Sequence, residues 1–219
     1  MDKTNETATT RLIEESVVQF AEHLAAESAA PGGGSAAALA GALAAALTGM
    51  VGRLTAGRSK FAAVDATMRA IIIEADAQRA ALLALVDADA AAFEEVMAAF
   101  RLPKESSDQK AARTAAIQAA YRGAVAVPLQ TLTAAAALLR LLVIVTEVGN
   151  PNAISDGGVG ALLAEAAAQG AALNVRINLT SIHDTAFTTA TAAQVDELLA
   201  QVAQLRGQAL AQVMQRLTA

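Results

Sequence analysis

The stretch that most constrains the fold of this chain runs from Pro31 to Met50, where a glycine-rich turn leads directly into an uncharged, alanine-rich segment. Pro31 fixes its own φ angle, and the three glycines that follow can adopt backbone conformations closed to other residues. Ser35 is then a good N-cap for a helix. From Ser35 to Gly52 no residue is charged and small residues recur at a spacing of three and four, so this helix needs neighbours on every side.

The glycine turn Gly32-Gly33-Gly34 is compatible with two interpretations. Taken alone, it fits a packing turn as well as it fits a binding loop. The free N–H groups and the positive dipole end of the following helix would suit a carboxylate or a developing negative charge. The turn matches neither the dinucleotide-binding nor the Walker pattern, and no strand-like run precedes it, so both of these nucleotide-binding loops are excluded.

The composition predicts an all-α fold in a single domain. A chain of 219 residues can bury a core without disulfides or metals, and here 55% of the residues are hydrophobic but only 3% are aromatic. Alanine dominates, which favours closely packed helices over sheets. We expect residues 1–10 to form a flexible tail, because they lack the apolar run of a signal peptide, and residues 11–219 to form one bundle of long helices.

Charge and residue usage exclude several classes of function. The formal charge of −5 comes without a basic cluster, so neither nucleic acid nor an anionic membrane is an expected partner. The absence of cysteine excludes disulfides, thiolate catalysis and zinc–sulfur sites and fits a cytoplasmic location, while two scattered histidines offer no metal cluster. Residues 35–52 and 129–148 approach the length of a membrane span, but alanine in the first and Arg140 in the second favour buried helices.

Apolar periodicity and helix-breaking residues predict helices over residues 11–27, 35–54, 62–100, 109–127, 128–147, 159–182 and 191–217. Pro128 either kinks one continuous helix or starts a new one. The helix over 62–100 would be roughly 55 Å long at a rise of about 1.5 Å per residue, which is longer than a small domain is wide. We therefore expect it to carry a contact between subunits.

Two pairs of charged residues are candidates for chemistry. Arg58 and Lys60 follow the alanine-rich helix in a turn, where solvated surface charge is the alternative interpretation. In the long helix, Asp89 lies next to the core register and is expected to be partly buried. Asp87 lies about 200° away around the helix and is expected to be solvated.

The second irregular stretch, from Gly149 to Gly160, contains Asn150 and Asp156. Its density of Asn, Ser, Asp and Gly exceeds what a helix connection needs, although capping of the next helix by Asp156 or its neighbour Ser155 is an alternative role. The helix that follows carries Asn174 and Asn178 one turn apart on one face. His23, in the first helix, is interpreted as a surface histidine.

Taken together, these landmarks resemble the cyclodeaminase/cyclohydrolase family of folate enzymes. In chain order they are PGGGSAAALAGALAAALTGMV, LTAGRSKF, LVDADAAAFEEVM, RLPK, the Val127-Pro128 pair, GNPNAISD and GALLAEAAAQGAALNVRINL, and they cover residues 12–200. The family includes bacterial methenyltetrahydrofolate cyclohydrolases and the cyclodeaminase half of formiminotransferase-cyclodeaminase. The resemblance implies an all-helical subunit, a homodimer with long central helices, and a tetrahydrofolate substrate with no metal or other cofactor.

One motif departs from the family pattern. The family often has GKKKY where this chain has GRSKF, at Gly57 to Phe61. Ser59 therefore replaces a cation, and Phe61 lacks the hydroxyl of the family's tyrosine. An activity that relied on that hydroxyl is not expected in this chain.

The resemblance also implies roles for the candidate residues. Both reactions of the family pass through a tetrahedral carbon that bridges N5 and N10 of tetrahydrofolate, and both need proton transfer and stabilisation of an amidinium cation. We therefore predict that Asp156 and Asp89 are acid/base or cation-stabilising groups. The predicted substrate ligands are Gly32, Gly33, Gly34, Ser35, Arg58, Lys60, Asn150, Asn174 and Asn178, with the two cations directed at the glutamate tail.

The expected function is that of a methenyltetrahydrofolate cyclohydrolase, which hydrolyses 5,10-methenyltetrahydrofolate to 10-formyltetrahydrofolate, because no formiminotransferase segment accompanies the helical domain. Formiminotetrahydrofolate cyclodeaminase, which releases ammonia and forms the methenyl compound, is the first alternative. A noncatalytic helical interaction protein is the second. That second alternative predicts that the Asp and Asn residues of GNPNAISD and NVRIN lie dispersed on the surface instead of converging on one cavity.

Overall fold

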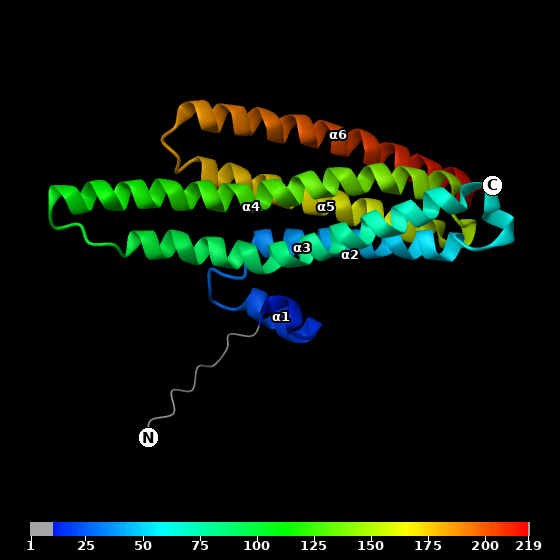
Figure 1. Ribbon diagram of the computed structural model, residues 1–219, viewed down its shortest axis with the longest axis horizontal. Helices are drawn as coiled ribbons and strands as arrows, with labels where there is room; N and C mark the ends of the chain where they lie inside the picture. The colour runs from blue at the N-terminus through cyan, green and yellow to red at the C-terminus, as the bar shows by residue number, and fades with distance from the viewer. Residues whose placement is uncertain (1–10, 219) are drawn as a thin grey trace, which may run out of the picture.

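The computed structural model describes residues 11–218, and every regular element within that range is a helix (Figure 1). The predicted all-α fold is confirmed. The predicted flexible tail, residues 1–10, lies outside the described residues. The α-helices of the described chain are α1 Val17–Ala25, α2 Gly33–Thr55, α3 Asp65–Phe100, α4 Ser107–Val148, α5 Ile154–Leu179 and α6 Thr185–Leu217, and the short 3-10 turns are η1 Leu12–Glu14, η2 Ser59–Val64 and η3 Pro151–Ala153.

Helices α2 to α6 form an elongated bundle in which α2 packs against α3, α4 and α5 (Figure 1). The approach is close because small residues line α2. A methyl group added at Gly41 would lie 3.0 Å from Cδ2 of Leu82 on α3 and 3.5 Å from Cβ of Ala167 on α5, so little room remains between the three helices. Small residues at three-and-four spacing therefore bring the backbones together, as the sequence predicts.

Two of the described helices, α2 and α4, are long and apolar enough to cross a membrane, judged by length and composition alone. Within this structure, 61% of the apolar window of α2 and 56% of that of α4 are buried inside the protein. Leu132, Leu139 and Leu142 of α4 are fully buried. The apolar stretches that approach the length of a membrane span thus supply much of the core.

The long helices α3 and α4 continue past the start of α2 (Figure 1). With 23, 36 and 42 residues, α2, α3 and α4 are roughly 35, 54 and 63 Å long at a rise of about 1.5 Å per residue. No helix of the described chain continues α2 beyond its first residue, Gly33. The bundle therefore has space in line with α2, bounded by its longer neighbours.

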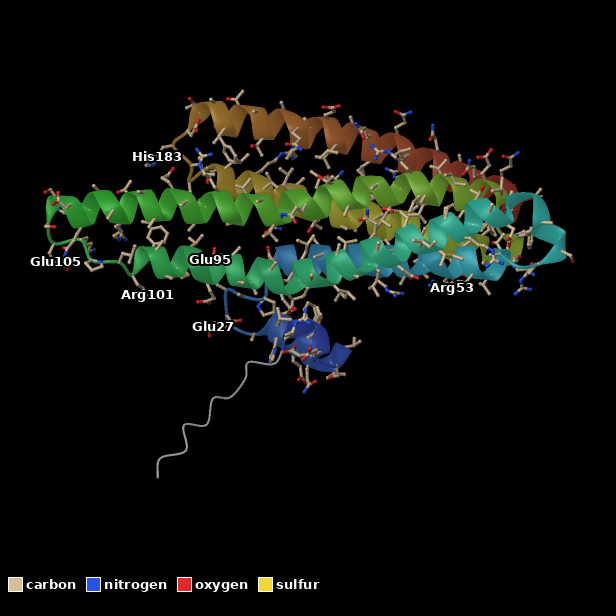
Figure 2. All side chains as sticks on the ribbon, in the orientation of Figure 1. Glu27, Arg53, Glu95, Arg101, Glu105 and His183 are labelled. Atoms are coloured by element: carbon tan, nitrogen blue, oxygen red, sulfur yellow. The ribbon has the colours of Figure 1, made fainter. Side chains whose placement is uncertain are left out.

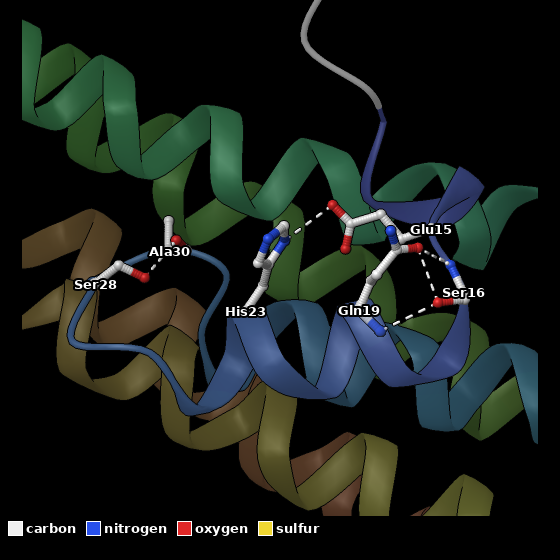
Figure 3. Close-up of polar contacts among 6 residues, drawn as sticks. All are labelled: Glu15, Ser16, Gln19, His23, Ser28 and Ala30. Carbon is white, nitrogen blue, oxygen red and sulfur yellow. Dashed lines mark hydrogen bonds and ion pairs between the residues drawn. The ribbon is translucent and has the colours of Figure 1, made fainter.

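The segment that precedes α2 lies outside the bundle (Figure 1). Ser16 caps α1 through reciprocal hydrogen bonds with Gln19, and His23 faces the carboxylate of Glu15 (Figure 3). The distance from Nδ1 of His23 to that carboxylate is 3.0 Å. His23 is a surface residue, as predicted. No residue of α1 is buried, and Val17 at its start is 87% exposed.

The structure corrects several predicted helix starts. Ser35 does not cap α2, because Gly32 is the N-cap and Ser35 lies inside the first turn. Neither Ser155 nor Asp156 caps α5, because that helix begins at residue 154 with Ala153 as its N-cap. The preceding 3-10 turn leads directly into α5, so the helix starts five residues before the predicted position.

Two further features of the chain are settled by the structure. Helix α4 is continuous through Pro128, so the proline does not start a new helix. Helix α6 begins at Thr185, six residues before the predicted start, because Asp184 caps it by accepting a hydrogen bond from the N–H of Phe187 at 3.0 Å.

The close packing of α2 predicts opposite effects for two glycine substitutions. Gly41→Val should lower the free energy of unfolding by about 1–3 kcal/mol, because the added methyl groups overpack the contact with Leu82. Gly207→Ala in α6 should raise it by about 0.5–1 kcal/mol, because the added methyl meets nothing within 4 Å and alanine favours a helix. Urea unfolding followed by circular dichroism measures both changes, and a neutral Gly41→Val would contradict the packing described here.

Candidate active site

A cavity of about 250 Å³ lies beyond the N-terminus of α2, in the space that the longer helices bound. Its walls come from four helices and the chain that enters α2. The lining residues are Ala29, Ala30, Gly32, Gly33, Gly34, Asp89, Ala92, Phe93, Val96, Met97, Phe100, Tyr121, Ala124, Asn174 and Asn178. Asp89 is the carboxylate among them, and it lies where the cavity meets the first turn of α2.

Asp89 is held by the start of α2. The hydroxyl oxygen of Ser35 lies 3.0 Å from Oδ2 of Asp89 and also 3.0 Å from the backbone carbonyl oxygen of Val86. A hydroxyl has one proton, so Ser35 can donate to only one of these acceptors at a time. When Asp89 is ionised, Ser35 can donate to it; when Asp89 is protonated, it can donate to Ser35, whose proton then turns to Val86. Both protonation states of the carboxyl group can therefore be hydrogen-bonded.

Gly34 is required by the position of the same carboxylate. A side chain at residue 34 would overlap the carboxyl group of Asp89, because Asp89 packs directly against the backbone of α2. The N-cap residue of α2, Gly32, has no side chain to cap the helix, and the N–H of Ser35 in the first turn interacts instead with the Asp89 carboxylate. The glycine turn therefore allows close packing and also lets a carboxylate reach the N-terminus of a helix. It combines the features of a packing turn and of a loop that holds a carboxylate, the two interpretations that the sequence leaves open.

The surroundings of Asp89 shift its titration. Burial raises the pKa of the Asp89 carboxyl above its ordinary value of 3.8, because the charged form loses water, while the side-chain and backbone hydrogen bonds from Ser35 oppose part of that rise. Asp89 is half-buried, as predicted. Asp87, predicted to be solvated, faces the opposite way and pairs with Arg11 at 3.0 Å near the surface.

Asn174 and Asn178 also face the cavity, and backbone carbonyl groups orient both side chains. Nδ2 of Asn174 donates to the carbonyl of Gly170 at 2.9 Å, and Nδ2 of Asn178 donates to the carbonyl of Ala124 on α4 at 2.8 Å. Pro128 explains the second bond: it has no N–H, so the carbonyl four residues earlier, that of Ala124, lacks its helical donor. These bonds leave the amide oxygens of both asparagines for a ligand.

An apolar wall forms the far end of the cavity. The rings of Phe100 and Tyr121 meet edge to face with centroids 6.3 Å apart, and the guanidinium of Arg113 lies 5.4 Å from the Phe100 ring centroid while donating to that residue's carbonyl. Phe93 and Met97 continue this wall along α3 toward Asp89. The cavity is thus polar at one end and aromatic at the other, which suits a flat aromatic ligand with a reactive polar group.

The other predicted site residues lie at the opposite end of α2, roughly 35 Å away along a helix of 23 residues. Arg58 and Lys60 are exposed near η2. Asn150 uses its polar groups internally, because its N–H and Nδ2 donate to Thr55 and Leu54, and its Oδ1 accepts from Asn152. Within one subunit these residues do not join the cavity.

Asp156 also lies at this distant end, half-buried in the first turn of α5. The structure therefore brings Asp89, Ser35, Asn174, Asn178 and the glycine turn together and leaves Asp156 apart. The Asp and Asn residues of GNPNAISD and NVRIN therefore do not converge on one cavity within a subunit, contrary to the expectation for an active site built from both motifs. Asn174 and Asn178 converge instead with Asp89. Groups of three or more His, Cys, Asp or Glu able to hold a metal ion do not occur within residues 11–218.

Comparisons with known proteins place the chain in a family. The model of the formiminotransferase-cyclodeaminase family matches residues 16–197. The chain belongs to the formiminotransferase-cyclodeaminase family. This confirms the resemblance that the sequence motifs indicate. A methenyltetrahydrofolate cyclohydrolase of Methylorubrum extorquens is 37% identical over 191 residues, which cover 87% of this chain and 92% of that protein.

Other family members extend the comparison. The formimidoyltransferase-cyclodeaminase of Rattus norvegicus is 41% identical over 188 residues, but the matched part is only 35% of its length, so this chain spans about a third of that relative. The crystal structure of formiminotetrahydrofolate cyclodeaminase from Thermotoga maritima matches with a TM-score of 0.83 and 28% identity, covering 92% of this chain and 96% of that one. The helical bundle of this chain therefore has the same fold as that cyclodeaminase.

Sequence reasoning misses the aromatic wall and the part played by Pro128. Tyr121 is the one tyrosine in the chain, and that rarity is a signal that could have singled it out. Phe93, Met97 and Phe100 read simply as members of the apolar stripe of α3, because a cavity wall and a core have the same periodicity. Pro128 is visible in the sequence, but its effect on Asn178 depends on which helix packs beside it.

The contact at Gly34 predicts a non-additive pair of substitutions. Gly34→Ala should lower the free energy of unfolding by about 1–3 kcal/mol, because the new methyl group displaces the Asp89 carboxylate. In an Asp89→Ala background the same change should cost about 1 kcal/mol less, because the clash is gone. Gly33→Ala is the control, since its methyl group would meet Asn174 at an ordinary 3.5 Å. Urea unfolding of the single and double variants measures the coupling, and additive costs would contradict the contact.

The raised pKa of Asp89 predicts a dependence of stability on pH. The folded state binds the Asp89 proton more tightly than the unfolded chain does, so this group's contribution to the unfolding free energy falls as pH rises from 3.8 through the raised pKa. The asparagine side chain of Asp89→Asn carries no charge, so this variant should have a higher free energy of unfolding than the wild type at neutral pH. The difference should shrink toward acidic pH. Urea unfolding across a pH series measures it, and a variant that is less stable at neutral pH would oppose this assignment.

Proposed function

We propose that this chain is a methenyltetrahydrofolate cyclohydrolase that converts 5,10-methenyltetrahydrofolate to 10-formyltetrahydrofolate. The observation that carries the proposal is the carboxylate of Asp89, half-buried at the polar end of a cavity whose other end is aromatic and hydrogen-bonded to Ser35. The cyclohydrolase of Methylorubrum extorquens supports the choice of reaction, because this chain aligns with 92% of its length.

In the proposed reaction, water adds to the methenyl carbon between N5 and N10. Asp89 accepts a proton from the attacking water, and a neutral tetrahedral carbon with one hydroxyl results. The protonated Asp89 then donates a proton to N5 as the bond between carbon and N5 breaks, and the hydroxyl proton is lost as the formyl group forms on N10. One proton is released overall, and a pKa that burial raises above its ordinary value suits a carboxyl group that both accepts and donates a proton.

The other cavity residues would bind and orient the substrate. The amide oxygens of Asn174 and Asn178 can accept hydrogen bonds from the pterin or face the amidinium cation, and the ionised Asp89 further stabilises that cation. The rings of Phe100 and Tyr121 offer an apolar surface to an aromatic ring of the substrate. We propose no metal or other cofactor, because proton transfer by Asp89 and hydrogen bonding account for each step.

A cyclodeaminase reaction is the second candidate function. It is favoured by the match to the formiminotetrahydrofolate cyclodeaminase of Thermotoga maritima, which covers 96% of that chain. In this reaction N10 attacks the 5-formimino carbon and ammonia leaves, so Asp89 would protonate the departing nitrogen. The same cavity serves both reactions, since both pass through a tetrahedral carbon between N5 and N10.

We also propose a homodimer with a tetrahydrofolate derivative as its ligand, without nucleic acid or membrane as a partner, in the cytoplasm. The dimer is supported by an exposed apolar face on the bundle, which includes Leu43 of α2 at 49% exposure and Leu173 of α5 at 65%. The cytoplasmic location is supported by the complete absence of cysteine from the chain.

The proposed function is tested by mixing the purified protein with 5,10-methenyltetrahydrofolate and, separately, with 5-formiminotetrahydrofolate. Loss of the methenyl chromophore in the first reaction is expected. Gain of that chromophore with release of ammonia in the second would favour the cyclodeaminase. Activity on neither substrate would refute both proposals.

Asp89→Asn should lower turnover of the active substrate by about 10²-fold or more, because the amide cannot exchange a proton with the substrate. The matched control is Asp87→Asn, on the same helix two residues away but paired with Arg11 outside the cavity, which should retain near wild-type turnover. Initial rates at saturating substrate measure the effect. An active Asp89→Asn variant would move the proton-transfer role to another residue.

A further inference from the structure

The polar end of the cavity is built from one acidic side chain and two amide side chains. They are the carboxylate of Asp89, which packs against Gly34, and the amides of Asn174 and Asn178. Among the described residues that line the cavity, none is Lys, Arg or His. An ionised carboxylate only accepts hydrogen bonds, whereas an amide can face a ligand with either its oxygen or its NH2 group. The orientation of the two amides therefore decides which ligand charge the cavity favours.

The two amides are oriented by different means. Nδ2 of Asn174 donates to the carbonyl of Gly170 at 2.9 Å, four residues earlier in the same helix. Nδ2 of Asn178 donates instead to the carbonyl of Ala124 on α4 at 2.8 Å, so its orientation depends on a neighbouring helix. In a regular α-helix this carbonyl would accept the N–H of residue 128, which is a proline here. Pro128 therefore gives the NH2 group of Asn178 a partner on α4.

We propose that Pro128 is a positioning residue of the cavity, which holds the amide oxygen of Asn178 toward the ligand and so makes the site selective for a flat aromatic cation of the amidinium class. The carboxylate of Asp89 and the oxygens of both amides then face the charged group, and the aromatic wall holds the ring. In the proposed function this cation is the amidinium of the methenyl substrate, so the identity of the natural ligand rests on that function. The selectivity itself rests on the hydrogen bonds of the two amides.

The difference between the two orientations of Asn178 is electrostatic. With the oxygen inward, the negative end of the amide dipole faces the ligand and attracts a cation, whereas an inward NH2 group would repel it with two partly positive hydrogens. Asp89 is half-buried and the far end of the cavity is aromatic, so water screens these charges less than it does at the surface. Turning this one amide should therefore change the affinity for a cation much more than the affinity for a neutral ligand of the same shape.

Further hydrogen bonds hold the end of α5 at the cavity against α4. Nε2 of Gln118 on α4 donates to the carbonyl of Ser181 at 2.9 Å, and Oε1 of the same side chain accepts the N–H of His183 at 2.8 Å. Figure 2 places His183 in the turn after α5, beside α4. These bonds do not involve position 128. Replacement of Pro128 should therefore leave α5 in place against α4.

Binding of two small probes tests the proposal. Benzamidine carries an amidinium group on a flat ring, and benzamide is a neutral compound of nearly the same shape. In ligand-observed NMR titrations, the wild type should bind benzamidine at least about tenfold more tightly than benzamide. Pro128→Ala should lose roughly tenfold in affinity for benzamidine, because the restored N–H at position 128 satisfies the Ala124 carbonyl and the NH2 group of Asn178 is free to face the cavity. Equal binding of both probes by the wild type, or an unchanged preference in Pro128→Ala, would overturn the proposal.

Pro103→Ala is the matched control for removal of a proline. Pro103 lies in the exposed turn between α3 and α4 and does not line the cavity, so this variant should keep the wild-type preference for benzamidine. Urea unfolding separates a positioning role from a structural one. Pro128→Ala should unfold at the wild-type urea concentration or above it, because α4 gains a hydrogen bond. A less stable Pro128→Ala that loses both probes equally would show that the proline only supports the fold.

A double substitution tests whether binding can be regained. Asn178→Asp alone should weaken benzamidine binding, because a carboxylate cannot donate to the Ala124 carbonyl and the two acceptors repel each other. In a Pro128→Ala background the restored N–H satisfies that carbonyl, so the new carboxylate can face the ligand. Benzamidine affinity of the double variant should then return to within about threefold of the wild type. Losses that simply add would contradict the coupling of the two positions.

Neither probe is a folate, so these titrations are independent of the proposed function. If the preference for benzamidine depends on position 128 as expected but the wild type acts on neither folate, the proposed function fails and the positioning role of Pro128 stands. If the wild type turns over a folate but the preference does not depend on position 128, the positioning role fails and the proposed function stands.

Discussion

The packing of the Asp89 carboxylate against the first turn of α2 governs the organisation of this end of the molecule. The carboxylate can reach the backbone only because residue 34 is glycine, and it is held there by the hydroxyl and N–H of Ser35. Its burial raises its pKa, which favours the neutral state and suits a group that exchanges protons. The helix that supplies these contacts is itself packed closely against its neighbours by small residues, so the position of the Asp89 carboxylate depends directly on the core.

Much of the fold could be predicted from the sequence because long helices leave a strong periodic signal. The glycine turn, the uncharged helix after it and the half-buried state of Asp89 all follow from local pattern. The role of Ser35 could not be predicted in this way. A serine at the start of a helix reads as a cap, and only the approach of α3 shows that its hydroxyl serves Asp89 and Val86. The same limit applies to Asp156, which reads as a cap but lies inside the first turn of α5.

Distance along the sequence does not show where a candidate residue lies along the bundle. Arg58 follows the glycine turn by fewer than thirty residues, yet a straight helix carries it to the far end of the molecule. Tyr121 is much further along the chain and lies in the cavity, because α4 runs back past that end. Sequence motifs identify candidate residues but not where each one lies along the bundle. They therefore group residues that lie at opposite ends of one subunit.

Pro128 gives the bundle an unusual long-range dependence. By removing one donor from α4, it leaves the carbonyl of Ala124 to be satisfied by the side chain of Asn178, fifty residues later in the chain. Any other residue at 128 would restore a competing N–H, and any apolar residue at 178 would strand the carbonyl in a buried position. The hydrogen bonding of each position thus depends on the residue at the other. A substitution at only one of the two positions would leave a polar group at the cavity without its hydrogen-bond partner.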